Sequence, residues 1–214
     1  MRQLLLDFTQ APAPTFENFV HGGNAELFHA LTAAANGNPA DRVIYMWGEP
    51  GCGKTHLARA FEAAAAGRPA YRVVDDVERL TEEEQVALFN AFNEHAFEFL
   101  LATASAAPRD VPIRRDLATR LATGLTYRLL ALTDAEKRAA LAAHARARGF
   151  DLPEEISAYL LTHSRRDMGS LISALDAIDR YSLENGRPVT LPLLKAAMGE
   201  PGTDPNRMNR GPSP

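Results

Sequence analysis

The sequence lacks a second cysteine, a long apolar run and any excess of positive charge. Its single cysteine, Cys52, cannot form a disulfide within the chain, which favours a reducing compartment. The sequence contains no stretch of roughly 18 apolar residues, so it predicts no transmembrane helix. The start of the chain has a short apolar run and an early acid, Asp7, unlike a signal peptide. We therefore expect a cytoplasmic protein.

The charge balance is slightly acidic. Lys and Arg number 23 and Asp and Glu number 27, so the net charge is −4. Such a surface has no general attraction for nucleic acid or anionic membranes, and contact with DNA needs a local basic patch or a partner. With 214 residues, 46% of them hydrophobic, the chain can bury one medium core and carry a small additional domain.

Strand and helix patterns alternate in the first part of the chain. Helices are expected from Asn24 and over 54–66 and 81–95, and strands over 42–47, 71–76, 97–105 and 125–132. This alternation predicts an α/β domain, residues 11–132, with a mainly parallel sheet of about four core strands flanked by helices.

The flanks of this domain differ in pattern. Four successive helical patterns predict a small all-α lid domain over residues 133–199. The tail, 200–214, is rich in Gly, Pro and Asn and is predicted to be disordered. At the other end, prolines over 11–14 favour extended backbone, so residues 1–10 are predicted to be a tethered peptide outside the core.

A phosphate-binding loop follows the first strand. Gly48, Gly53, Lys54 and Thr55 fit G-x-x-x-x-G-K-[ST] between a strand and a helix. Inward N–H groups, the lysine charge and the helix N-terminus attract phosphate, and the threonine hydroxyl can ligate Mg²⁺. The alternative is an ordinary glycine-containing turn. The other predicted cofactor-binding residues of this segment are Pro50, Gly51, Cys52 and His56.

Polar residues end the next two strands. Asp75 is predicted to hold a water of the magnesium ion, and Asp76 to orient an attacking water. Thr103, or failing it Ser105, is placed to touch the γ-phosphate or the water. The alternatives are that the two acids merely belong to a turn and that the hydroxyl of Thr103 is merely hydrogen-bonded at the end of its strand. Because glutamate is the more usual second acid of efficient ATPases, we expect slow intrinsic turnover.

These motifs resemble the DnaA-like branch of the AAA+ ATPases, and within it the members that inactivate DnaA. The resemblance rests on "PTFENFVHGGNAEL", "GEPGCGKTHL", "VVDDVERL", "LLATASAAPRDV", "DLATRLATGLTYRLLALTDAEK" and "RARGFDLPEEISAYLL". It implies an AAA+ fold that binds ADP or ATP, with Phe19, Val20 and Asn24 on the base side of the nucleotide. Core packing is the alternative for these three residues.

Two further features support the implied regulation. Gln3, Leu4, Leu6 and Phe8 look like the peptide by which proteins dock on the bacterial sliding clamp, and a frayed end or accessory strand is the alternative. Because no further domain pattern follows the lid pattern in this sequence, we do not expect the helix-turn-helix domain with which DnaA reads DNA.

Arginines carry the remaining implied roles. The resemblance places an arginine finger on Arg120, and the alternative is an i,i+4 ion pair with Asp116. The family's second sensor arginine falls on Gly169, so Arg165 or Arg166 is expected to replace it. The protein should then depend little on having ATP rather than ADP.

Together these features predict a regulator of replication initiation. It would bind nucleotide and Mg²⁺, dock on the β clamp of DNA polymerase III, reach DNA only through partners and stimulate hydrolysis by ATP-bound DnaA. A stand-alone ATPase or helicase loader and a small-molecule kinase are the other classes, and homo-oligomerisation stays open. Finally, only about twenty residues separate Lys54 from Asp75, enough for one crossover helix, so the strand that carries Asp75 should lie at the sheet edge.

Overall fold

The computed structural model describes residues 13–186 and 188–197, which divide into an α/β unit, Ala13–Leu132, and a helical unit from Thr133 onward. The α/β unit contains α1 (Ala25–Ala35), β1 (Val43–Trp47), α2 (Lys54–Ala64), β2 (Tyr71–Val74), the 3₁₀ turn η1 (Val77–Arg79), α3 (Glu82–Asn93), β3 (Phe99–Ala104), α4 (Arg115–Leu121) and β4 (Leu125–Arg128).

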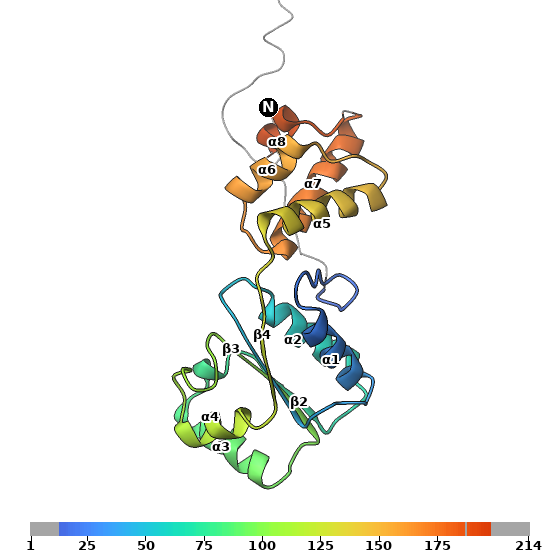
Figure 1. Ribbon diagram of the computed structural model, residues 1–214. Coiled ribbons are helices and arrows are strands. Elements are labelled where there is room, and N and C mark those ends of the chain that lie inside the picture. The colour runs from blue at the N-terminus through green and yellow to red at the C-terminus, as the bar shows by residue number, and fades with distance from the viewer. Residues whose placement is uncertain (1–12, 187, 198–214) are drawn as a thin grey trace, which may run out of the picture. The chain divides into compact units, whose positions relative to one another are not determined.

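The four strands form one parallel sheet in the order β2-β3-β1-β4. Helices α1 and α2 cover one face, and α3 and α4 cover the other (Figure 1). The predicted parallel sheet covered on both faces is confirmed. Because a crossover returns each strand in the same direction, all carboxyl ends of the strands meet at one edge of the sheet.

The central strands are apolar on both sides because both faces are covered. Successive side chains of a strand point to opposite faces. In β1, Ile44 and Met46 join the core under α1 and α2, whereas Val43 and Tyr45 join the core under α3 and α4. All six residues of β3 are buried.

The two edge strands, β2 and β4, agree with the sequence predictions to different extents. Strand β2 lies at an edge of the described sheet, as predicted, and its Arg72 is exposed. The strand predicted over 125–132 ends earlier, at Arg128. Its neighbour β1 turns into the glycine loop after Trp47, and the N–H and C=O of Leu130 bond instead to the side chain of Asn24.

The helical unit has a core of its own. It consists of α5 (Asp134–Ala147), α6 (Glu154–His163), α7 (Met168–Asn185) and α8 (Leu191–Ala197). Leu141, Leu160 and Leu175 are fully buried among these helices. Thr133 caps α5 in a capping box, and Asp167 caps α7, because each side chain accepts an otherwise unpaired N–H of the first turn.

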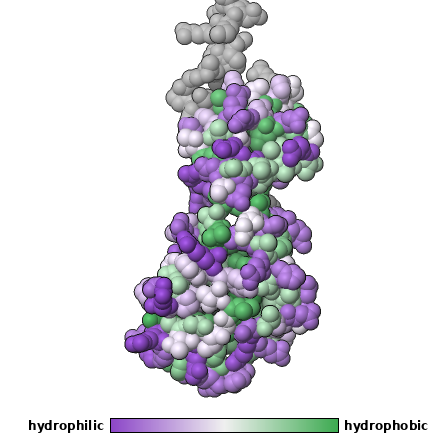
Figure 2. Space-filling view, viewed as in Figure 1, coloured by the Kyte–Doolittle hydropathy of each residue, from purple (hydrophilic) through white to green (hydrophobic). Residues whose placement is uncertain are grey.

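The surface is mixed. On the face shown in Figure 2, apolar residues lie scattered among hydrophilic ones on both units. Leu130 and Leu183 are the large apolar side chains that are exposed in the described part of the chain. None of the helices in that part combines the length and the low polarity needed to cross a bilayer.

A close backbone approach precedes β4. A Cβ atom on Gly124 would lie 2.2 Å from the carbonyl oxygen of Val43, whereas one on Gly67 would meet nothing within 4 Å. We therefore expect Gly124→Ala to lower the free energy of unfolding by about 1–3 kcal/mol, because β1 must shift to make room. Gly67→Ala is the matched control, with a change within about 0.5 kcal/mol. Urea denaturation of both variants checks this, and equal midpoints would contradict it.

Candidate functional site

The glycine loop joins β1 to α2 at the carboxyl edge of the sheet. Its first residue, Gly48, donates its N–H to the carbonyl of Ala104 at the end of β3. A Cβ on Gly48 would lie 2.5 Å from the carbonyl oxygen of Leu129, so only glycine fits there. Gly51 and Gly53 have φ of 78° and 111°, a left-handed backbone that glycine adopts without strain.

Lys54 is the first residue of α2 and is buried. Its Nζ donates to the carbonyl oxygens of Gly48 at 2.8 Å and Glu49 at 3.3 Å. The first N–H groups of a helix have no partner within it and attract anions. The loop therefore brings the charge of Lys54 and the N-terminus of α2 together in one place.

The flanking loop residues have different surroundings. Cys52 is buried, and burial raises the pKa of its thiol, although the charge of Lys54 acts in the opposite sense. Pro50 is exposed, and Thr55 and His56 are half-buried at the start of α2. A raised pKa leaves less of the Cys52 thiol in the nucleophilic thiolate form at neutral pH.

Register brings the predicted acids together with Thr103. Val74 of β2 pairs with Ala102 of β3, so the residues that follow them, Asp75 and Thr103, lie level. The hydroxyl of Thr103 donates to Oδ1 of Asp75 at 2.5 Å and accepts the N–H of Asp76 at 2.8 Å. Thr103 is fully buried. Its hydroxyl therefore binds the carboxylate of Asp75 and the backbone of Asp76 out of contact with water.

Asp76 is further held by Arg79, a residue that the sequence analysis missed. Asp76 has a left-handed backbone, φ 53° and ψ 64°, and its Oδ2 lies 3.3 Å from Nε of Arg79. The i,i+3 spacing was the available signal. Glu78, also missed, accepts the N–H of Ser105 at 2.8 Å, and this contact follows from the position of β3 rather than from any local pattern.

The predicted base-side residues lie beside the loop. The ring of Phe19 lies 5.4 Å from that of His56, and a Cβ on Gly53 would lie 3.0 Å from its Cε2. Asn24 is buried and bonds through its amide to the carbonyls of His21 and Leu130 and to the N–H of Leu130. Val20 is half-buried in the same segment. Phe19 is thus brought to the loop, whereas Asn24 fixes the exit of β4.

Arg120 lies apart from this loop, on α4. It is exposed, and its guanidinium carbon lies 5.9 Å from the ring centroids of Phe89 and Phe92 on α3. The alternative ion pair with Asp116 is not formed, because Asp116 bonds to Arg114. Among the described residues, no carboxylate forms an ion pair with Arg120.

The helical unit holds the arginines expected to replace the sensor. Arg166 binds both carboxylate oxygens of Asp134, and Nε of Arg165 lies 3.6 Å from Asp167. Gly169 lies in the first turn of α7. The predicted clamp residues, Gln3, Leu4, Leu6 and Phe8, lie outside the described residues.

The parallel sheet, the glycine loop and the separate helical unit define a P-loop protein of the AAA+ class. Family models agree: that for the bacterial DnaA ATPase domain matches residues 11–74, and that for the lid domain of Hda matches residues 134–198. A Haemophilus influenzae protein described as uncharacterized is 32% identical over 225 residues, which cover 91% of this chain and 97% of that protein. The chain belongs to the Hda-like, DnaA-related family of AAA+ proteins.

Solved structures share the fold at lower identity. Domain III of the Thermotoga maritima replication initiation protein DnaA matches with a TM-score of 0.69 and 20% identity over 87% of this chain and 96% of that one. AMPPCP-bound DnaA from Aquifex aeolicus matches with a TM-score of 0.65 and 20% identity over 81% of this chain and 67% of that one.

The contacts of Thr103 make a prediction about stability. Thr103→Val keeps the shape but leaves the N–H of Asp76 and a carboxylate oxygen of Asp75 without their partner. We expect the free energy of unfolding to fall by about 1–3 kcal/mol. Thr126→Val, at an exposed position of β4, is the control and should change it by less than about 0.5 kcal/mol. Equal urea midpoints for the two variants would show that the Thr103 hydroxyl is dispensable.

Proposed function

We propose that this chain regulates replication initiation: it binds an adenine nucleotide, docks on the DNA-loaded sliding clamp and stimulates ATP hydrolysis by DnaA through Arg120. The observation that carries the proposal is an exposed arginine on α4 that no carboxylate of the described residues neutralises. The proposed partner, DnaA, follows from the family, because family models for Hda and DnaA match the two parts of the chain.

The glycine loop is the proposed nucleotide site. The loop fits a phosphate: three glycines occur where a side chain would clash or strain the backbone. Among the described residues, the buried Lys54 ammonium bonds to two carbonyls of the loop and forms no ion pair with a carboxylate. Lys54 and the first N–H groups of α2 would hold the phosphates, and Phe19 would contact the base. The related DnaA of Aquifex aeolicus was solved with AMPPCP.

A magnesium ion would add charge neutralisation between the phosphates. The described residues contain no group of three or more His, Cys, Asp or Glu side chains that could hold a metal by themselves. Thr55 would therefore be the direct protein ligand, with phosphate and water oxygens as the others, and Asp75 would hold one of those waters. Thr103 orients Asp75 for this role through their hydrogen bond.

The same contacts favour slow hydrolysis at the chain's own site. Asp76 pairs with Arg79 through its carboxylate, and its N–H bonds to Thr103, so the contact with Arg79 would compete with the role of orienting water. An aspartate is also shorter than the glutamate that efficient ATPases use. The nucleotide of this chain would then serve to shape the protein.

Arg120 would act on the nucleotide of a partner. A guanidinium stays charged at all physiological pH values and its planar donors match phosphate oxygens. In the transition state of phosphoryl transfer, charge spreads over the oxygens of the γ-phosphate, and an arginine supplied by a neighbour stabilises it. The rings of Phe89 and Phe92 support the guanidinium without neutralising it.

Clamp docking rests on the sequence alone. Gln3, Leu4, Leu6 and Phe8 have the amide and apolar groups that would enter a pocket of the clamp. Docking through these residues would then hold Arg120 near DnaA on DNA at a high effective concentration. No DNA-binding surface of the chain's own is required.

Nucleotide binding can be tested at Lys54. Lys54→Ala removes a charged donor from the phosphates, so affinity for ADP and ATP should fall about 10- to 100-fold. Arg59→Ala, an exposed position on α2, is the control and should bind as the unaltered chain does. Titration with a fluorescent ADP analogue measures both. Undiminished binding by Lys54→Ala would contradict the site, and fast turnover by the isolated chain would favour the stand-alone ATPase.

Partner stimulation can be tested at Arg120. ATP hydrolysis by DnaA is measured with the chain, the clamp and DNA present. Arg120→Ala should remove most of the stimulation, because arginine fingers contribute about 10³–10⁵ in rate. Arg109→Ala, an exposed arginine on the loop before α4, should stimulate as fully as the unaltered chain. Full stimulation by Arg120→Ala would rule out the finger. In the same assay, a chain without residues 1–10 should no longer stimulate hydrolysis. In a separate binding measurement, it should no longer be retained on immobilised clamp.

A further inference from the structure

Helix α4 carries an acid one turn before Arg120. Asp116 and Arg120 are four residues apart, so their side chains leave the same face of the helix. An acid that precedes a base by four residues is the favourable order for an ion pair. Such a pair would occupy the guanidinium that the proposed function requires.

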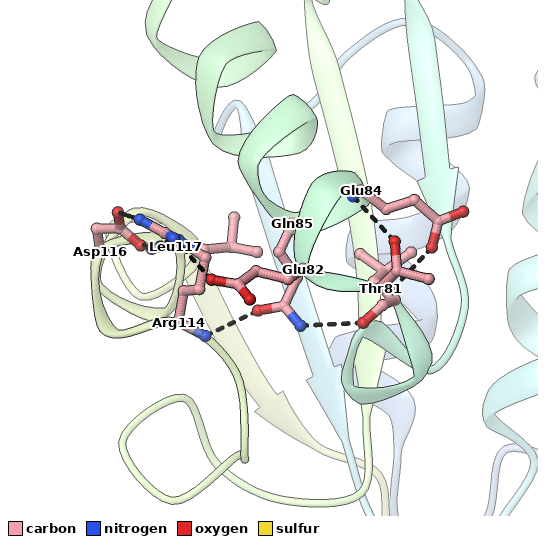
Figure 3. A network of polar contacts seen from close by, with 8 residues as sticks. Thr81, Glu82, Glu84, Gln85, Arg114, Asp116 and Leu117 are labelled. Atoms are coloured by element: carbon pink, nitrogen blue, oxygen red, sulfur yellow. Dashed lines mark hydrogen bonds and ion pairs between the residues drawn. The ribbon is translucent and has the colours of Figure 1, made fainter.

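A second arginine holds Asp116 instead. In Arg114, Nε lies 3.2 Å from Oδ1 and Nη2 lies 2.8 Å from Oδ2 of Asp116, a bidentate contact (Figure 3). Nη1 of Arg114 lies 3.6 Å from Glu82 on α3. The Arg114 guanidinium lowers the pKa of Asp116, and Asp116 in turn raises the pKa of Arg114. Both oxygens of the acid are therefore bound by Arg114.

The backbone of Arg114 is fixed by the packing of α3 on α4. Its N–H donates to Oε1 of Gln85 at 2.8 Å, and Nε2 of Gln85 donates to the carbonyl of Leu80 at 3.0 Å (Figure 3). Gln85 is largely buried, and both bonds lie partly out of contact with water. Oδ1 of Asp116 also accepts the N–H of Leu117 at 2.8 Å, which holds the acid at the start of α4.

We propose that Arg114 is a positioning residue: by holding Asp116, it keeps the guanidinium of Arg120 available for the phosphate of a partner. The inference rests on the proposed function of Arg120. Without Arg114, Asp116 and Glu82 lose their partner, and Asp116 can turn towards Arg120. A negative charge then lies next to the finger and also repels the partner's nucleotide.

The test uses four variants in the DnaA hydrolysis assay with clamp and DNA. Arg114→Ala should reduce stimulation about two- to fivefold, the size expected for a new i,i+4 pair with an added unpaired acid. The double variant Arg114→Ala/Asp116→Asn should restore it, because asparagine keeps the acceptor for the N–H of Leu117 but carries no charge. Asp116→Asn alone and Arg115→Ala, the neighbouring exposed arginine, should stimulate as the unaltered chain does.

The loss in Arg114→Ala should also shrink as salt is raised, because salt screens surface pairs. Full stimulation by Arg114→Ala would overturn the proposal. So would a double variant as weak as Arg114→Ala, because the loss would then come from a damaged helix start. Thermal unfolding of each variant confirms that it is folded.

A measurement without DnaA separates this inference from the proposed function. NMR of the arginine Nε–H groups should show the Arg120 signal titrating with Asp116 in Arg114→Ala, and not in the unaltered chain or the double variant. If Arg120→Ala stimulates DnaA fully, the proposed function fails whatever this spectrum shows. If Arg120 is required and its signal is the same in all variants, the inference about Arg114 alone fails.

Discussion

The parallel pairing of β1 with β3 is the interaction on which the rest of the structure depends. It sets Met46 level with Thr103, so the glycine loop after β1 and the polar end of β3 begin at the same edge of the sheet. The pairing of β3 with β2 then adds Asp75 at that edge. A shift of one residue would point every strand side chain to the opposite face and remove Thr103 from the acids.

Acids and bases are used differently in the two parts of the α/β unit. At the loop, Asp75 and Asp76 are bound by Thr103 and Arg79 within the chain. On α4, Arg120 rests on aromatic rings without an acidic partner in the described residues. The acids at the loop already have partners within the chain, whereas Arg120 has no acidic partner among the described residues. Such a protein is better suited to completing the nucleotide site of a neighbour than to rapid hydrolysis at its own nucleotide site. This contrast is the physical basis of the proposed function.

Much of the fold follows from local patterns. The apolar runs of β1 and β3, the helical pattern over 81–95 and the short crossover before β2 predict two strands, a helix and the sheet edge, and the structure agrees. In the structure, Thr81 caps the start of that helix, α3. The end of β4 was predicted too late. Its apolar residues continue the strand pattern, but the strand has no partner beyond Trp47, and Asn24, more than a hundred residues earlier, takes the backbone groups of Leu130.

The sequence by itself determined the order of strands and helices along the chain, the phosphate loop and the candidate residues. These features depend on helix and strand periods, on glycine conformations and on loop spacing, which are properties of residues close together in the chain. Only the tertiary structure decided which charges meet. Asp116 could pair with Arg120 or with Arg114, and the local spacing favours the first. Asp116 pairs with Arg114, and the backbone of Arg114 is held by Gln85 of α3, a contact that exists only once α3 packs against α4.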